Sequence, residues 1–542
     1  MKTFLRSLVI GLMITVSAFI SNAQQVVTLS GSITANTTLD NTNIYLLQGF
    51  VYVRSGATLT IPAGTLIKGD RTSKGTLIIE RGAKIMAQGT AALPIVFTSN
   101  QAPGLRSYGD WGGVVICGNA TQNQPGSPII EGGVGSAFGG TDDTDNSGVL
   151  SYVRIEFAGI PLVPGNEING LTMGAVGSGT TIDHVQVSYC GDDAFEWFGG
   201  TVNAKHLISF RTWDDDFDTD FGFRGNVQFG LALRDPKVAD QSRSNFFEAD
   251  NDATGSDNTP FSASTFSNIT AAVIPGPDTL HRLNGRDAHL RRNTRSSIFN
   301  SVLAGMNTGI LLDGAKCEAN ASSNALELNN NILHARRSSS LFQVATGSTF
   351  LSTLASWFTT GRGNDTTSVA PAIAYQALGV SANFFNLQNP DFSITAPSLM
   401  ATGAAFTSGR LASSFFDRVT YRGAINPANP TDWMAGWTNF DPLNTNYSAP
   451  LSLASGITTK PIALFPNPTS GNTTLVADVA TATEVNLMIT DLTGRKVMGT
   501  THALEAGSNM IPVQTTGLPN GIYNVSISNG RASSTQRLVI SQ

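Results

Sequence analysis

The sequence predicts an all-β chain, in which a right-handed parallel β-helix solenoid is followed by a small Ig-like antiparallel β-sandwich. Short apolar alternations, cut by Gly, Asn and Asp, recur along the body of the chain, as expected of stacked strands joined by turns. Helix periodicity is almost absent, apart from one short stretch near 349–360. Two segments also repeat one pattern at a spacing that suits one rung of a β-helix.

The repeated segments are HVQVSYCGDDAFE, residues 184–196, and HLISFRTWDDDFD, residues 206–218. Both read His, Val or Leu, six further residues, Asp-Asp, any residue, Phe and an acid, and every matched position is offset by 22 residues. The two segments are therefore expected on adjacent rungs, with equivalent positions stacked. A β-sandwich array or a propeller is the alternative architecture, but no blade repeat of about 40–50 residues is visible.

The order of segments predicts five parts. Lys2 and Arg6 precede an apolar run, Leu8–Ile20, and small residues end at Ala23, a pattern typical of a cleaved signal peptide. No later segment is apolar enough to span a bilayer, so the mature chain is expected to have no membrane span. The expected parts are the signal peptide (1–23), the β-helix (24–345), the end of the solenoid with a cap (346–450), a linker (451–461) and a C-terminal domain (462–542).

Charge and motif content argue against several function classes. The chain has 33 Lys+Arg against 39 Asp+Glu, a net charge of −6, and no basic stripe, so nucleic acid is not an expected partner. It has no Walker loop, Rossmann fingerprint, GxSxG or HExxH motif, and no nucleotide cofactor is implied. The three cysteines are far apart and are expected to be buried thiols.

The last part of the chain carries four motifs. They are LFPNPTSG at 464–471, DLTGRKV at 491–497, LPNGIYNV at 518–525 and QRLVI at 536–540. Two of them read as turns between alternating strands, which predicts an antiparallel sandwich. In this order the motifs resemble the type A sorting domain of the type IX secretion system. The resemblance implies that the secretion machinery recognises residues 462–542, and that the protein is secreted or held at the cell surface, across the outer membrane.

The body resembles a group of exported β-helix proteins and, more distantly, the pectin-lyase-like superfamily. The segments that carry the resemblance are GDDAFEWFGGTVNAKHL, WDDDFDTDFGFRGNVQFGLALRDP, FFEADNDATGS and TDWMAGWTNFDP. The match spans most of Tyr45 to Pro442. The superfamily includes polysaccharide lyases, glycoside hydrolases and non-catalytic adhesins, so the resemblance implies a fold without choosing among these functions.

Carboxylates are concentrated in one region of a chain that is only 13% charged: five aspartates fall in the seven positions from Asp214 to Asp220. The 22-residue offset stacks Asp192 on Asp214, Asp193 on Asp215, and Glu196 on Asp218. Bare carboxylates about 5 Å apart repel by roughly 3 kcal/mol at an effective dielectric of about 20. Such a stack needs a bound cation, basic neighbours or protonation.

Calcium is the most natural remedy, since it takes about six to eight oxygen ligands. The candidate ligands are Asp192, Asp193, Glu196, Asp214, Asp215, Asp216, Asp218 and Asp220. In an extended chain, Asp216 would share a face with Asp214, Asp218 and Asp220, and Asp215 would face the other way. The loop 250–258 begins like a calcium loop but has Phe261 in place of the expected glutamate, a partial match. The alternative is ordinary corner bonding with arginine compensation.

A catalytic interpretation of the same acids stays open. Glycosidases need two carboxylates about 5–9 Å apart, and crowding would raise the pKa of one of them, as a general acid requires. Asp193 and Asp215 are the candidates. Lyases of the resembling superfamily use calcium with an Arg or Lys base, which points to Arg211, Arg224 or Arg234. For each of them, a salt bridge to the aspartates is the competing explanation.

Aromatic residues interleave with these acids. Trp197 and Trp213 are candidate platforms for sugar rings, or else core residues. Two further pairs share the 22-residue offset and are expected to stack: Phe195 with Phe217 in the core, and His184 with His206. For the two histidines, a metal-binding role is the alternative to structural stacking.

The sequence favours an exported β-helix protein that binds a glycan or matrix polysaccharide, with calcium at its acidic corners. No complete catalytic constellation can be assembled from it, so binding is preferred over catalysis. The alternatives are a calcium-assisted polysaccharide lyase or glycoside hydrolase, and a purely structural surface protein.

Overall fold

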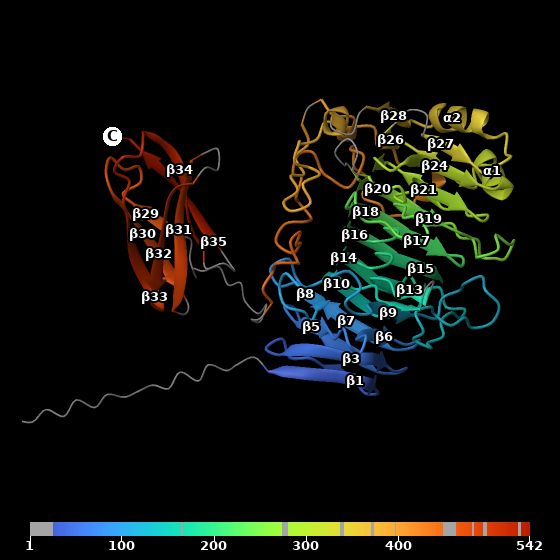
Figure 1. The fold of residues 1–542 in the computed structure, drawn as a ribbon, viewed down its shortest axis with the longest axis horizontal. Helices are drawn as coiled ribbons and strands as arrows, with labels where there is room; N and C mark the ends of the chain where they lie inside the picture. Colours follow the sequence, from blue (N-terminus) through green and yellow to red (C-terminus); the bar gives the residue numbers. More distant parts are fainter. Residues whose placement is uncertain are drawn as a thin grey trace, which may run out of the picture.

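The computed structural model of the chain describes residues 25–163, 166–273, 280–336, 341–369, 373–395, 397–447, 462–479, 482–491, 496–528 and 533–541. The predicted signal peptide and linker lie outside these residues. Among the residues described, no helix is both long enough and apolar enough to cross a bilayer. The predicted fold class is confirmed: parallel strands build the body, and antiparallel strands build the C-terminal domain (Figure 1).

The body is a solenoid whose strands pair in parallel from rung to rung over three faces. The first face holds β2 (Thr37–Thr38), β4 (Thr58–Ile61), β7 (Lys84–Gln88), the first halves of β10 (Gly148–Glu156), β14 (Thr181–Ser188), β16 (Asn203–Phe210), β18 (Asn226–Leu233) and β20 (Thr265–Ala272), then β22 (Ser297–Phe299) and β25 (Leu328–Asn329).

The second and third faces follow the same rungs. The second holds β1 (Val26–Ile33), β3 (Ile44–Val53), β5 (Leu66–Gly69), β8 (Ile95–Ser99), the second halves of β10, β14, β16, β18 and β20, then β23 (Val302–Ala304), β26 (Ile332–Ala335) and β28 (Asp365–Ser368). The third holds the ends of β1 and β3, then β6 (Thr76–Ile79), β9 (Val114–Cys117), β13 (Leu171–Val176), β15 (Phe195–Gly200), β17 (Phe217–Asp220), β19 (Phe247–Ala249), β21 (Arg286–Arg291), β24 (Thr308–Asp313) and β27 (Phe342–Val344). A small hairpin joins β11 (Pro161–Val163) and β12 (Asn166–Glu167).

A bend in each long strand separates the first face from the second. The residue at the bend has φ in the left-handed region: Tyr152 at 52°, His184 at 54°, His206 at 55°, Phe229 at 60° and Asn268 at 58°. This conformation is uncommon for bulky side chains. Stacking accompanies it here: the rings of Tyr152, His184, His206 and Phe229 stack from rung to rung, with successive centroids 4.3, 4.2 and 5.3 Å apart. The predicted stacking of the two histidines is confirmed.

The interior of the solenoid is one continuous apolar core. Phe195, Phe217 and Phe247 stack along it with ring centroids 5.9 and 5.3 Å apart, which confirms the predicted phenylalanine pair. Each fully buried phenylalanine side chain contributes roughly 1.5–3 kcal/mol to the free energy of folding relative to an exposed one. This column of phenylalanines therefore favours the observed register of β15, β17 and β19. The three cysteines are free and buried, as expected.

The region 346–447 first completes the solenoid and then covers one side of it. Among the residues described, three α-helices lie in the C-terminal part of the body: α1 (Ala315–Ser322), α2 (Leu351–Thr359), where one was expected, and α3 (Ala374–Leu378). Residues 397–447, called the strap here, run back alongside the solenoid (orange in Figure 1). Gly423 N–H donates to Asn300 O at 2.7 Å, and Arg106 Nη1 donates to Pro442 O at 2.5 Å. The strap therefore passes from the last rungs towards the first, with 3-10 turns at Leu399–Ala401 and Gly409–Leu411.

The C-terminal domain has two antiparallel sheets around one small core. One sheet contains β29 (Ala463–Phe465), β30 (Thr473–Val479) and β33 (Gly507–Val513); the other contains β32 (Lys496–Leu504), β31 (Thr483–Asp491), β34 (Gly521–Ser528) and β35 (Ser533–Ile540). Alternate residues of these strands, such as Leu475, Ile489 and Val525, are buried in that core. The predicted antiparallel sandwich is confirmed.

Candidate functional site

Strand register confirms one of the predicted stacked pairs, Glu196 on Asp218, on the third face. Glu196 on β15 pairs with Asp218 on β17, and Asp218 pairs with Glu248 on β19. His289 on β21 follows Glu248 in the same column. We call the following set the acidic ladder: Asp192, Asp193, Glu196, Asp214, Asp215, Asp218 and Glu248.

The oxygens of the acidic ladder approach one another in three overlapping triplets. Within each triplet the ligand atoms lie within 4.8 Å of one another: Asp192 with Asp193 and Asp214, Asp193 with Glu196 and Asp218, and Asp215 with Asp218 and Glu248. Asp193 and Asp218 each belong to two triplets. The carboxylates therefore form one continuous chain of oxygens across three rungs.

Hydrogen bonds orient some of these carboxylates and leave others without a partner. Asp193 Oδ1 accepts from the Asp215 N–H at 2.7 Å, and Asp214 Oδ2 accepts from Ser242 Oγ at 2.6 Å. The Oδ1 atoms of Asp214 and Asp218 are buried and have no hydrogen-bond partner. Buried polar atoms are nearly always paired, so these two oxygens are exceptions that the protein's own hydrogen bonds do not satisfy.

Burial and mutual repulsion raise the pKa values of the ladder acids other than Glu248. Burial acts on Glu248 too, but its hydrogen bond to His289 and the charge of Arg291 outweigh burial and lower its pKa. Burial is the larger cause for Asp193, whose pKa lies well above its usual value, and the neighbouring charge of Asp215 raises it further. Burial likewise raises the pKa of Asp214 to about 7. The same causes raise the pKa values of Asp192, Glu196, Asp215 and Asp218. Ionising the whole ladder without a counter-charge is therefore costly.

Asp216 does not join the ladder, so the expected alternation of faces is wrong at this point. Its carboxylate pairs with Arg234 at 3.0 Å, and both side chains are fully buried. Asp215 turns towards Asp218 and Glu248 in its place. The reason is local: residues 214–216 form the corner before β17, and only 217–220 are extended, so the alternation of a strand does not apply to them.

Asp220 and the loop 250–258 also lie outside the triplets. Asp220 Oδ1 accepts from the Phe221 N–H at 2.6 Å. Asp250 is held by Arg291 and Arg292 at 2.8 and 2.7 Å. Asp252 accepts from Thr254 and Ser256 in its own turn. The loop is thus ordered by arginine pairing and turn bonds, which was the alternative to a calcium loop.

Arg211 and Arg224 are bound away from the ladder. Arg211 pairs with Asp235 and donates to Tyr189 Oη at 3.0 Å. Arg224 pairs with Asp143 at 3.1 Å and also donates to Thr121. Neither guanidinium has an ion pair with a ladder acid. The contacts of these two arginines therefore give no support to their role as a lyase base acting beside Asp193 or Asp215.

Sequence reasoning missed two acids that complete the cluster. Asn169 Nδ2 donates to Glu131 Oε1 at 3.1 Å and also to Glu196, so a loop residue, Glu131, lies against the ladder. Burial raises the pKa of both glutamates. Glu248 could have been found, because Phe247-Glu248 repeats the Phe-acid pair of Phe217-Asp218, but at an offset of 30 residues. Nothing in the sequence around Glu131 indicates its position.

The two tryptophans have different environments. Trp197 is fully buried and stacks on Phe223, with centroids 5.3 Å apart, so its assignment as a sugar platform is wrong and it belongs to the core. Trp213 is 39% exposed and lines a pocket of about 740 Å³. The lining residues are Trp213, Ala239, Asp240, Gln241, Arg243, His281, Arg282 and Leu283.

The pocket adjoins the acidic ladder through Ser242. Its Oγ lies 2.6 Å from Asp214 Oδ2 and 2.9 Å from Asp240 Oδ2, so one hydroxyl links a ladder acid with a residue of the pocket wall. Asn245, a few residues further on, donates from its N–H to Asp215. The segment 240–245 therefore forms the boundary between the two features.

Comparison with known proteins agrees with this architecture. Residues 31–438 match the family described as pectate-lyase like beta helix domain. The chain belongs to this family. In addition, residues 463–541 match the secretion system C-terminal sorting domain. This pectate-lyase-like β-helix protein is therefore exported by the type IX secretion system to the cell surface or beyond.

Similarity beyond the families is low. A crystal structure of the Dettilon tailspike protein (gp208) is similar to this chain at 9% sequence identity and a TM-score of 0.20, with 92% of this chain and 84% of that chain covered. The search of curated proteins found no match.

Proposed function

We propose that this exported β-helix protein binds an acidic glycan in the pocket beside Trp213 and holds calcium on the adjoining acidic ladder. One observation carries the proposal: among the described residues, the ladder acids other than Glu248 have no ion pair, and the arginines of the pocket have no acidic partner, yet only the segment 240–245 separates the two sets. Glu248, at the end of the ladder, is paired with Arg291 and His289. A ligand that carries anions and is bound together with a cation would satisfy both sets.

Calcium accounts for the ladder better than compensation by arginine does. Of the eight ligands predicted from the sequence, Asp216 is the one with an ion pair among the described residues. The other seven depend on hydrogen bonds or have unpartnered oxygens. Calcium prefers a ligand set made of oxygens, carboxylates above all, as the ladder offers, whereas zinc and copper favour nitrogen or sulfur ligands.

The pocket offers the groups that recognise an acidic sugar. Arg243 and Arg282 have no ion pair or side-chain hydrogen bond within the described part of the chain. Arg286 is near Arg243: burial lowers its pKa, and the charge of Arg243 lowers it further. Guanidinium groups match carboxylate and sulfate oxygens, and the exposed Trp213 ring can cover the apolar face of a sugar.

Titration calorimetry tests the proposal. Oligogalacturonate should bind the full chain in calcium, more tightly than a neutral galactan of equal length. Trp213→Ala and Arg282→Ala should each weaken binding about tenfold. Arg418→Ala, an exposed arginine outside the pocket, is the matched control and should bind normally. Equal binding of the neutral chain, or an unaffected Arg282→Ala variant, would contradict the proposal and leave a structural surface protein as the better assignment.

A second candidate, glycoside hydrolysis, is favoured by the pair of Glu131 and Glu196. Both carboxyl groups share Asn169 as a donor, and burial raises their pKa values, which suits a general acid. Release of new reducing ends from oligogalacturonate tests this function. Glu131→Gln, which lies outside the calcium triplets, should abolish release; an inactive wild-type protein that still binds the oligosaccharide leaves binding as the function.

A further inference from the structure

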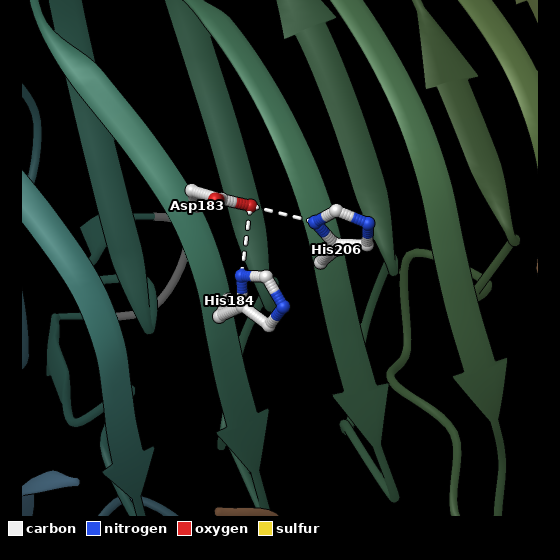
Figure 2. A group of neighbouring side chains, drawn as sticks. All are labelled: Asp183, His184 and His206. Atoms are coloured by element: carbon white, nitrogen blue, oxygen red, sulfur yellow. Dashed lines mark hydrogen bonds and ion pairs between the residues drawn. The ribbon is translucent and has the colours of Figure 1, made fainter. Parts of the chain in front are cut away.

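A second cluster of metal-ligating side chains lies at the bend between the first and second faces, apart from the third face that carries the ladder. Asp183 and His184 are adjacent on β14, and His206 is on β16 (Figure 2). Asp183 Oδ1 lies 3.0 Å from His184 Nδ1 and 2.7 Å from His206 Nδ1. The three ligand atoms all lie within 4.8 Å of one another.

Aromatic stacking does not by itself explain why these residues are histidines. The same column holds Tyr152 on the rung before and Phe229 on the rung after, so a ring without a nitrogen at that place is sufficient for the stack. Histidines occupy the two middle rungs of the column. Asp183, which directly precedes His184, contacts both histidine rings with its carboxylate. The combination provides a set of donor atoms that stacking does not need.

One of the nitrogens is buried and unsatisfied. His184 is 9% exposed, and its Nδ1 has no hydrogen-bond partner. Asp183 Oδ1 is close enough, but it lies off the direction of the ring N–H, so the contact is electrostatic and not a hydrogen bond. Buried nitrogens without a partner are rare. Figure 2 shows this nitrogen beside the Asp183 carboxylate, which His206 also contacts.

We propose that Asp183, His184 and His206 bind a single transition-metal ion, with zinc as the best fit. Imidazole nitrogen with one carboxylate oxygen is a ligand set of zinc, at about 2.0–2.2 Å per ligand, and calcium does not select it. A small rotation of the His184 ring aims its Nδ1 at the ion.

The surroundings give the ion access from one side only. The Asp183 side chain is 37% exposed, against 11% and 17% for the two histidines. On the strap, Trp433 lies 5.2 Å from the His206 ring and Trp437 lies 5.6 Å from the His184 ring. Water or an external ligand can therefore complete the coordination next to Asp183. The two indoles shield the rest.

The test uses the full chain, treated with chelator and then kept in excess calcium so that the ladder is saturated. Zinc chloride is titrated by calorimetry, and cobalt(II) reports the coordination geometry by its visible absorption. We expect one zinc ion per chain and quenching of tryptophan fluorescence by cobalt, because Trp433 and Trp437 are close to the site.

The variants separate metal binding from stacking. His206→Phe keeps an aromatic ring next to Phe229 and should fold normally, but it should weaken zinc binding about tenfold or more. Asp183→Asn, at a partly exposed position, should do the same. Asp218→Asn on the ladder and His502→Gln on the C-terminal domain are the controls and should bind zinc normally. If His206→Phe binds zinc as the wild type does, or if the wild type binds none, the histidines are a structural stack and the proposal is wrong.

Discussion

At the residue scale, buried charge is the largest local cost in this molecule. The Asp216 and Arg234 side chains are fully buried together, and Arg234 also donates to the backbone carbonyls of Trp213 and Asp214. Removing one member of such a pair leaves a charge without compensation in a medium that solvates it poorly. The pair therefore fixes the corner that aims Asp215 at the ladder.

Replacing Arg234 by methionine should destabilise the solenoid by about 3–5 kcal/mol, because Asp216 is left buried and unpaired. The double variant Asp216→Leu/Arg234→Met should recover most of that loss. Urea denaturation followed by circular dichroism measures both free energies of unfolding. A double variant no more stable than the single one would show that the backbone contacts of Arg234, and not its charge, matter most.

Asp287 gives a pH-dependent case. It is fully buried on β21, its Oδ1 accepts from the Met306 N–H at 3.2 Å, and its Oδ2 has no hydrogen-bond partner. Burial raises its pKa well above the usual value. The folded state therefore binds the proton more tightly than the unfolded chain, whose aspartates have a pKa of about 3.9. The stability that Asp287 contributes is present below that pH and is lost as pH rises through the folded pKa.

Asp287→Asn removes this titration and should stabilise the protein at pH 8 by roughly 1–3 kcal/mol, with little effect near pH 4. Melting temperatures measured from pH 4 to pH 8 test this, with Asp142→Asn, an exposed turn residue, as the control. A variant less stable than the wild type at pH 8 would contradict the expectation.

At the scale of elements, the bend between the first and second faces is the feature that repeats. It continues past the aromatic column into Asn268, Asn300 and Asn330, with φ values of 58°, 53° and 60°. Asparagine tolerates the left-handed region, whereas β-branched residues do not. The early rungs use ring stacking at this bend, and the later rungs use residues that adopt it with little strain.

The His206→Val variant should therefore have a free energy of unfolding about 1–3 kcal/mol lower than that of His206→Asn. Both variants lose the ring, so the difference reports the backbone conformation alone. Thermal melting in chelator, with no added zinc, makes the comparison. Equal melting temperatures would indicate that stacking, and not the backbone, decides the residue at this position.

At the scale of the whole molecule, the acidic ladder connects three rungs through one chain of carboxylates. The raised pKa values mean that, without a cation, the folded state binds more protons than the unfolded one, and its stability falls as pH rises. In the function proposed above, calcium on the ladder removes this repulsion and binds only the folded arrangement, so we expect calcium and acid to act on the same groups.

Calcium at about 100 times its dissociation constant should stabilise the protein by about 2.7 kcal/mol at pH 8. The effect should decline through pH 7, where Asp214 has its pKa, and should be small at pH 5. Asp193→Asn and Asp218→Asn should reduce it most, because each of these residues belongs to two triplets. Scanning calorimetry at each pH, with and without chelator, measures it; a calcium shift independent of pH would contradict the assignment.

The sequence was sufficient to predict those contacts that follow from the spacing of its repeat alone. A 22-residue offset, read from Asp192 and Asp214, fixed the column of acids, the phenylalanine column and the histidine stack, because parallel rungs bring equivalent positions about 4.8 Å apart. Separately, turn motifs in the sequence located the antiparallel C-terminal domain, and the match to a sorting domain agrees with this prediction. These features depend on short-range spacing, which the sequence states directly.

Contacts between distant segments required the tertiary structure. The corner at 214–216 sends Asp216 to Arg234 and not to the ladder. A loop brings Glu131 to Glu196, and the insertion before β19 changes the offset of Glu248 to 30 residues. The strap brings Trp433 over His206 from 227 positions later in the chain. By itself the sequence determined the fold class and the stacked columns, because local periodicity encodes them, and its four C-terminal motifs indicated export through their resemblance to a sorting domain. The tertiary structure decided which acids have partners, because long-range packing and burial set each partner's position.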